Sequence, residues 1–250
     1  VYGFQDREVD SYETYVPMGK HVSATRLWDR VTDDGRDATV LNVPVTFPPS
    51  SRIQRQVSGF LSPGLDAAAS DDAVRQVLED HDYRIDVNAK LGHDDDKAEF
   101  IENAHATLDA RYDVFTHYLA ADDWDLFFGV FMSTDRVNHF LFGDYANDGE
   151  YRDEFLEFYR RLDEYIGEIR DSLDDDTTLI VASDHGFTEL KWDVNCNQFL
   201  AEEGWLSYDG DDHDSLADID DETRAYSLIP GRFYLNLEGR EPEGVVPESA

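Results

Sequence analysis

The chain has 250 residues, which is enough for one large domain or two small ones. Hydrophobic residues make up 41% of it and aromatic residues 13%, so it can bury a sizeable core and is expected to be globular, not disordered. Its 56 Asp and Glu residues against 21 Lys and Arg residues give a net charge of −35. This charge excludes electrostatic binding to nucleic acid or to an anionic membrane surface.

The acidic residues are spread along the whole chain, and only four of the basic residues are Lys. Distributed acidity is typical of proteins from molar salt, where the screening length falls to about 3 Å and repulsion between carboxylates weakens. We therefore expect a halophilic protein. The single cysteine, Cys196, excludes an intramolecular disulfide and a cysteine-based zinc site. Since no signal peptide is evident and no apolar run approaches the roughly 20 residues of a membrane span, we expect a cytoplasmic location.

The first regular elements are predicted in the N-terminal half of the chain. A helix is expected over 24–31, with Gly35 as its C-terminal cap. The sequence ATVLNVPV (38–45) follows as a predicted strand. A second helix is expected from about Ala98 to Leu119.

Two strands with a helix between them are predicted in the second half. The sequences DLFFGVFM (125–132) and TTLIVA (177–182) are short apolar runs with polar flanks, typical of buried strands. The stretch 151–173 places apolar residues at spacings of three and four, which predicts an amphipathic helix. The alternation of strands and helices predicts an α/β fold, with a mainly parallel central sheet and helices on both of its faces.

We expect a single domain over 1–250. Within it, the acidic, glycine-containing sequence YDGDDHDSLADIDDE (208–222) is predicted to be a surface loop or lid. The sequence RFYLNL (232–237) is predicted to be the last strand, at a sheet edge because Pro230 and Gly231 precede it.

The predicted strand 125–132 runs into a carboxylate and an imidazole, Asp135 and His139. In open parallel sheets ligands bind at the carboxyl ends of the strands, so these residues are candidates for a site. Their spacing of four would place both on one face of a following helix, with about 5–6 Å between Cβ atoms, within reach of one cation. A turn hydrogen bond or a helix cap is the alternative explanation for such a pair.

The predicted strand 177–182 ends in a second such pair, Asp184 and His185. Gly186 permits a backbone conformation that aims both side chains inward. Because neighbouring parallel strands bring their ends within about 5–10 Å, the four side chains of the two pairs are expected to converge. A cluster of oxygen and nitrogen donors suits Zn²⁺ or Mn²⁺ better than Ca²⁺.

Other candidates lie near these strand ends. Asn42 and Thr46 lie at the end of a predicted strand and are candidates for contact with substrate, although a structural turn explains them as well. Arg136 and Asn138 lie inside the first motif, where phosphate contact and a capping or solvated role are both open. Asn195 is predicted to be a helix N-cap in preference to a substrate contact.

The motifs STDRVNH (133–139) and ASDHGF (182–187) resemble those of the alkaline phosphatase superfamily, in particular its type I phosphodiesterase/nucleotide pyrophosphatase branch. Within that branch, the chain resembles the predicted phosphohydrolase/phosphomutase group. The similarity covers nearly the whole chain in the same order, through the segments LWDRVTDDG, LNVPVTFPP, SGFLSP, RLDEYIGEIRDSL and GRFYLNLEGREPEGVV.

This resemblance implies a metal-dependent hydrolase of phosphate esters that uses two divalent metal ions, normally zinc, with manganese or magnesium as alternatives. By motif, Asp135 and His139 would bind one metal ion, and Asp184 and His185 the other. The expected partner is a small phosphate ester or a nucleotide. Two functions stay open as alternatives: a metal-dependent phosphomutase, and a non-catalytic binding domain that retains the fold.

The family's Thr or Ser nucleophile and two of its metal ligands, an Asp and a His, have no counterpart here. We therefore expect the chain to lack both ends of the family core, with the nucleophile upstream of Val1. We also expect the chain alone to be inactive.

Overall fold

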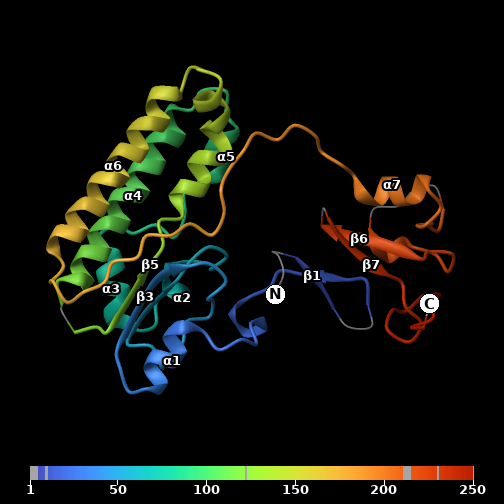
Figure 1. Cartoon of the computed structure of the whole chain (residues 1–250), viewed down its shortest axis with the longest axis horizontal. Helices are drawn as coiled ribbons and strands as arrows, with labels where there is room; N and C mark the ends of the chain where they lie inside the picture. Colours follow the sequence, from blue (N-terminus) through green and yellow to red (C-terminus); the bar gives the residue numbers. More distant parts are fainter. Residues whose placement is uncertain (1–4, 9–10, 122, 211–214, 230, 250) are drawn as a thin grey trace. The chain divides into compact units, whose positions relative to one another are not determined.

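A computed structural model describes residues 5–8, 11–121, 123–210, 215–229 and 231–249 of the chain. Contacts divide the chain into two compact units. Met18–Glu189 form one, called the sheet unit below, and Val1–Pro17 with Leu190–Ala250 form the other, called the terminal unit (Figure 1). We predicted a single domain over 1–250, and the division into two contact units does not test that prediction.

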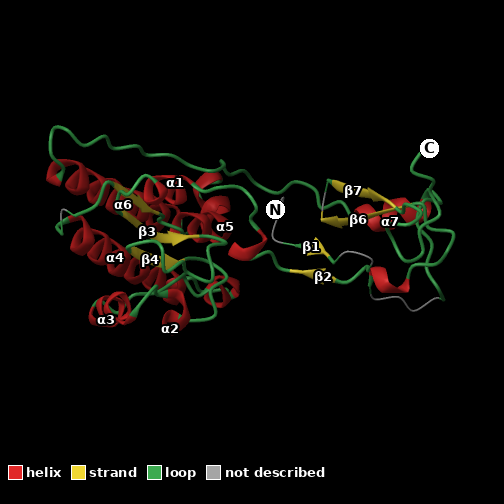
Figure 2. Cartoon of the chain, turned by 90° about the horizontal axis from the view of Figure 1, so that it is seen from below, coloured by secondary structure: helices red, strands yellow, loops and turns green. Residues whose placement is uncertain are grey.

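The sheet unit contains three parallel strands, β3 (Ala38–Val43), β4 (Arg55–Ser58) and β5 (Leu126–Gly129). Their order is β4-β3-β5, so β3 lies in the middle. β3 and β5 fall within the predicted strands 38–45 and 125–132, and β5 ends three residues early. Figure 2 shows these strands between layers of helices.

Alternate side chains of β3 pack on opposite faces of the sheet, as the two-residue period of a strand requires. Leu41 is buried against α3 (Asp72–Asp80) and α4 (Ala98–Leu119). Val40 is buried on the other face, in a cluster with Trp28 of α1 (Leu27–Asp33). Helices therefore cover both faces of a parallel sheet, which confirms the predicted α/β fold class.

The predicted helix 24–31 begins at Leu27 in the structure, and its predicted end at Gly35 is confirmed. Gly35 adopts φ 76° and donates to the Thr32 carbonyl (3.0 Å), while the Arg36 N–H donates to the Val31 carbonyl (3.2 Å). This pair of hydrogen bonds is a Schellman motif, whose left-handed residue glycine adopts without steric cost.

A helical layer extends from the sheet. α5 (Ser133–Ala146) and α6 (Arg152–Ser172) pack with α4 around buried side chains such as Phe158 and Leu141. The predicted helices 98–119 and 151–173 are thereby confirmed. The sheet unit also contains shorter elements: η1 (Gly19–His21), α2 (Leu65–Ala68) and η2 (Ala89–His93).

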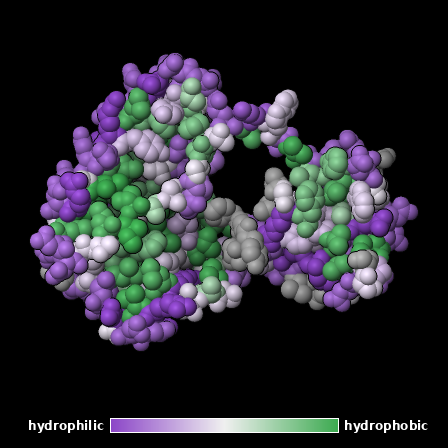
Figure 3. Space-filling view, in the orientation of Figure 1, coloured by the Kyte–Doolittle hydropathy of each residue, from purple (hydrophilic) through white to green (hydrophobic). Residues whose placement is uncertain are grey.

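The prediction of a buried strand over 177–182 is wrong: this segment is extended but pairs with no strand among the described residues. Its side chains are exposed, at 42% for Leu179, 80% for Ile180 and 64% for Val181. A physical reason lies in the preceding helix α6, which packs mainly on α5 and α4. A crossover helix brings the next strand into register only when it lies on the sheet. Figure 3 shows hydrophobic residues gathered on the face of this unit that the segment crosses in Figure 1.

The terminal unit contains two antiparallel strand pairs. β1 (Asp6–Arg7) pairs with β2 (Thr14–Tyr15), and β6 (Ala225–Ile229) pairs with β7 (Arg232–Leu235). β7 lies within the predicted strand 232–237 and has β6 as its one partner in the described part of the chain, so its edge position is confirmed. α7 (Cys196–Glu202) and η3 (Leu216–Asp218) complete this unit.

The predicted loop 208–222 belongs to the terminal unit, and its residues 211–214 lie outside the described residues. Of the rest, Tyr208 and Ile219 form an isolated antiparallel bridge, and Ser215 caps η3. The described part of the loop is therefore tied to itself by local hydrogen bonds. Its role as a lid stays a prediction.

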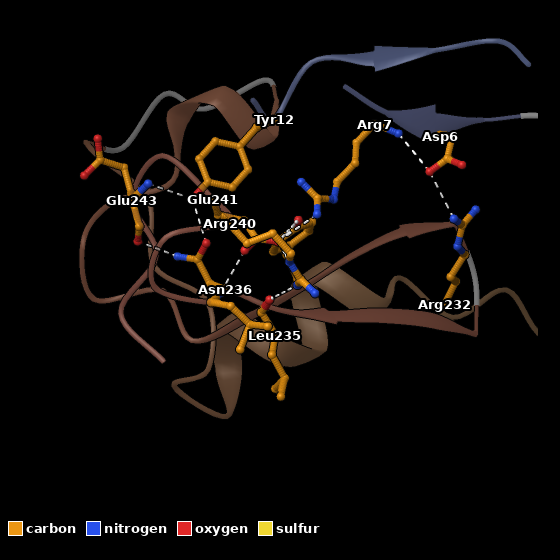
Figure 4. Close-up of polar contacts among 11 residues, drawn as sticks. Asp6, Arg7, Tyr12, Arg232, Leu235, Asn236, Arg240, Glu241 and Glu243 are labelled. Atoms are coloured by element: carbon orange, nitrogen blue, oxygen red, sulfur yellow. Dashed lines mark hydrogen bonds and ion pairs between the residues drawn. The ribbon is translucent and has the colours of Figure 1, made fainter. Parts of the chain in front are cut away.

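A buried polar network stabilises the terminal unit (Figure 4). The Glu241 side chain is fully buried and accepts from Arg240 Nε (2.7 Å), and its Oε1 lies 3.0 Å from Arg7 Nη2. Beside it, Tyr12 donates to Asn236 Oδ1 (2.7 Å). The N-terminal residues are thus joined to the C-terminal segment by the ion pair of Arg7 with Glu241 and by the hydrogen bond of Tyr12 with Asn236.

Candidate metal centre

The first predicted pair lies at the start of α5, just beyond the carboxyl end of β5. Asp135 is in the first turn of the helix, where a carboxylate is stabilised by the helix dipole. His139 follows one turn later, and its Nε2 lies 3.5 Å from Asp135 Oδ1. The predicted placement of both side chains on one helix face is therefore what the structure shows.

The second predicted pair lies in the extended segment that follows α6. His185 Nε2 is 3.6 Å from Asp184 Oδ2. The segment is attached to α5 through Phe187, whose ring packs edge-on against the ring of His139, with 5.0 Å between centroids, and against the ring of Phe142. Aromatic contact therefore holds the second motif against the helix that carries the first.

The two pairs meet at the carboxylate of Asp135. Its Oδ1 atom lies 3.5 Å from His139 Nε2 and 4.0 Å from His185 Nε2. These residues are 50 positions apart in the chain, and no strand pairing brings them together. The predicted convergence of the two motifs is present although the strand expected to produce it is not.

These donors suit a divalent cation in their chemistry and in their pairwise spacing. Ligand atoms around a tetrahedral cation with bonds of about 2.1 Å are about 3.4 Å apart, close to the separations of 3.5, 3.6 and 4.0 Å around Asp135 and His185. Among the described residues, however, no three or more His, Cys, Asp or Glu side chains already surround one point as a metal site does. Asp184 is 89% exposed, and the two imidazoles are 54% and 59% exposed. All three side chains are therefore accessible to a cation from solvent.

The environment of His185 favours its charged form. Its Nδ1 lies 2.8 Å from the Gly186 carbonyl, and this hydrogen bond is the main reason that the pKa of His185 is raised. The carboxylates of Asp184 and Asp135 act in the same direction. In the neutral imidazole, the hydrogen bond from Nδ1–H to Gly186 would leave Nε2 as the nitrogen that can bind a cation.

The other candidate residues are engaged in internal hydrogen bonds. Asn42 is fully buried, and Thr46 donates from Oγ1 to the Val43 carbonyl (2.6 Å). Asn138 donates to the Thr134 carbonyl (2.8 Å) and to Tyr159 Oη (2.6 Å). Direct contact of Asn42, Thr46 or Asn138 with substrate stays a prediction.

Asn195 caps α7, as predicted, since its Oδ1 accepts from the Gln198 N–H (3.0 Å). Sequence reasoning missed one neighbour of the centre, Asp86. This residue lies in an irregular loop 50 positions before Arg136, yet its carboxylate binds the Arg136 guanidinium. Nothing in the local sequence links the two, because their contact depends on how η2, α4 and α5 pack.

The family model for type I phosphodiesterase / nucleotide pyrophosphatase matches residues 1–248. No curated protein and no solved structure matches the chain. In the described ranges, none of the helices combines the length and the apolar composition that a membrane span requires. The family match covers both motifs that meet at Asp135 and indicates phosphoester hydrolysis. The chain therefore belongs to the type I phosphodiesterase/nucleotide pyrophosphatase family.

Proposed function

We propose that this chain contributes a centre for two divalent cations, zinc or manganese, to the hydrolysis of a small phosphate ester or a nucleotide. The observation that carries the proposal is the contact of one carboxylate, that of Asp135, with imidazoles from two distant motifs. A structural ion pair needs only one acidic and one basic side chain. A carboxylate flanked by two exposed imidazoles is better explained as part of a ligand set.

In this proposal Asp135 and His139 bind one cation, and Asp184 and His185 bind the other. Two such cations, when bound, polarise phosphoryl oxygens and lower the pKa of an attacking hydroxyl. The protein's own task is to hold four donors on one side of the substrate. α5 fixes the first pair, and the packing of Phe187 on α5 restrains the second.

The attacking oxygen is proposed to come from a Thr or Ser outside this chain. Three hydroxyls lie inside the motifs. Thr134 Oγ1 donates to the Phe131 carbonyl (3.0 Å) and Ser183 Oγ to the His185 carbonyl (2.5 Å), while Ser133 is fully buried. A nucleophile must instead be free to approach phosphorus, with a base or metal to take up its proton.

Metal binding by the 250-residue chain tests the ligand set. Calorimetric titration with MnCl₂ in 1 M NaCl suppresses loose cation binding to the acidic surface, since screening then extends only about 3 Å. We expect two cations per chain. Asp135→Asn should raise the Kd at least about tenfold, because loss of mere outer-shell partners already costs 10–100-fold. The matched control is Asp163→Asn, which removes an exposed carboxylate of α6. Equal affinities in the wild type, Asp135→Asn and Asp163→Asn would contradict the proposal.

Turnover tests the position of the nucleophile. With Mn²⁺ present, the chain should hydrolyse bis(p-nitrophenyl) phosphate no faster than its Asp184→Ala variant, both near background, because no hydroxyl is poised to attack. Robust metal-dependent turnover would contradict an outside nucleophile. Thr134→Ala and Ser183→Ala would then identify which hydroxyl of this chain attacks.

A further inference from the structure

Arg136 lies next to the candidate centre with its guanidinium fixed in direction. Asp86 Oδ2 accepts from Arg136 Nε (2.9 Å) and Nη2 (2.6 Å). The guanidinium carbon lies 4.7 Å from the centroid of the Phe60 ring, a cation–π contact. Both charged side chains are mostly buried, at 15% exposed for Arg136 and 17% for Asp86. The third corner of the guanidinium, Nη1, makes no hydrogen bond to any described residue.

The partner of Arg136 is itself held by the fold. Asp86 Oδ1 accepts from the Val87 N–H (2.8 Å), so both carboxylate oxygens are in use. The backbone just before it is held by Arg111 of α4, whose Nη2 donates to the carbonyls of Arg84 (3.0 Å) and Ile85 (2.7 Å). Arg111 is fully buried. The direction of the Arg136 guanidinium is therefore fixed by packed elements and not by solvent.

The Nη1 atom of Arg136, which makes no hydrogen bond to a described residue, faces the candidate centre. Arg136 Nη1 lies 3.6 Å from Asp135 Oδ2, beyond hydrogen-bond distance, while Asp135 Oδ1 faces the two imidazoles. The guanidinium and the imidazoles thus lie on opposite oxygens of one carboxylate. Among the ion pairs of the described residues, Arg136 supplies the one guanidinium or ammonium group that pairs with any of the four proposed ligands.

We propose that Arg136 is a binding residue for the phosphoryl group, donating from Nη1 to a non-bridging oxygen, and that Asp86 is its positioning residue. This inference rests on the proposed function and adds the side chain that recognises the anion. A planar guanidinium locked by one carboxylate presents its remaining donors in a fixed direction, the geometry that suits phosphate oxygens. In a chain of net charge −35, a phosphate needs such a local cation to offset the surrounding repulsion.

The probe is inorganic phosphate, titrated into the Mn²⁺-loaded 250-residue chain in 1 M NaCl. Arg136→Ala should raise the phosphate Kd about tenfold or more, equivalent to about 1.4 kcal/mol. Arg136→Lys, which keeps the charge but loses the fork, should lie between it and the wild type. Asp86→Asn should also weaken phosphate binding. The Mn²⁺ Kd, titrated separately, should change less than the phosphate Kd in each of the three variants, because Arg136 and Asp86 are not ligands and Arg136 touches the centre only through its 3.6 Å ion pair with Asp135.

The matched control is Arg160→Ala on α6, which removes the same charge from a side chain that is 62% exposed. Its phosphate Kd should equal that of the wild type. Two results would overturn the role of Arg136 without touching the proposed function. One is an equal phosphate Kd in the wild type, Arg136→Ala and Arg136→Lys while all three bind Mn²⁺. The other is a wild type that binds Mn²⁺ but no phosphate. A wild-type chain that binds no Mn²⁺ would overturn the proposed function and this inference with it. Should Arg136→Ala fail to fold, as judged by circular dichroism, Arg136→Lys and Asp86→Asn decide the outcome.

Discussion

Gly59 lies where the backbone of β3 leaves no room for a side chain, which makes it a sharp test of the sheet geometry. β3 has an irregularity after Leu41, where Asn42 takes φ 63°. This turn of the chain brings the Asn42 carbonyl against Gly59, which follows β4. A Cβ atom added to Gly59 would lie 2.3 Å from Asn42 O and 2.8 Å from the carbonyl carbon of Val43.

Gly59→Ala should therefore destabilise the sheet unit. Ordinary contact begins at 3.4 Å, so backbone atoms must separate by about 1.1 Å in a buried place. Overpacking of this kind costs about 1–3 kcal/mol or more. At about 2–4 °C per kcal/mol for a chain of this length, we expect the Tm to fall by at least about 2 °C. The measurement is thermal unfolding followed by circular dichroism in 1 M NaCl.

Gly167→Ala is the matched control, because it makes the same change where there is space. Gly167 lies inside α6, and an added Cβ would meet nothing within 4 Å. Alanine is favoured over glycine in a helix interior by about 0.8–1.0 kcal/mol, so the Tm should rise by about 2–4 °C. A Gly59→Ala protein as stable as the wild type, beside a stabilised Gly167→Ala protein, would refute the close approach of β3 and β4 at this point.

Two further predictions concern pH and salt. Burial raises the pKa of Tyr118 to about 12, so above pH 10 unfolding releases a proton that the folded state retains, and stability should fall as the pH rises from 10 to 12. Tyr118→Phe should lessen that fall in urea unfolding at pH 8 and pH 11. At pH 8 the variant should be about 1 kcal/mol more stable than the wild type, because the buried hydroxyl has no hydrogen-bond partner among the described residues. A loss of stability between pH 8 and pH 11 that is equal in both proteins would count against this burial. The net charge of −35 predicts a lower Tm at 0.1 M NaCl than at 1 M NaCl, since the screening length grows from about 3 to about 10 Å; a Tm that is unchanged or higher at 0.1 M would contradict the expectation of a halophilic protein.

Local sequence patterns predicted α1, β3, α4, β5 and α6 of the sheet unit but not β4, α2 or α3. The spacing of apolar residues was sufficient for α4 and α6, because a long amphipathic helix repeats its signal over several turns. The segment 177–182 shows the limit of such patterns. Its composition is that of a buried strand, but burial requires a neighbour, and the packing of α6 decides whether a neighbour is within reach.

The sequence was sufficient to predict the four candidate ligands of the centre but not the residues that contact them. Asp135 and His139 are linked by helical spacing alone, so the sequence was enough to place them together. Asp86 has no such link with Arg136, because their ion pair depends on a loop held by a buried arginine in another helix. Residues that act through tertiary contact carry no local signature, even when they lie beside a motif that does.

The net negative charge of the chain repels the anionic substrate that the proposed chemistry requires. The repulsion and the proposed attraction act over different distances. A net charge of −35 repels a phosphate ester over the screening length, which is about 10 Å at 0.1 M salt and about 3 Å at 1 M. The proposed contacts with Arg136 and with the cations act at hydrogen-bond and coordination distances of about 2–3 Å, within the screening length even in molar salt. High salt therefore removes most of the long-range repulsion and leaves the short-range attraction largely intact. On this reasoning, an acidic surface is compatible with an anionic substrate as long as the cations that bind it lie at the centre itself.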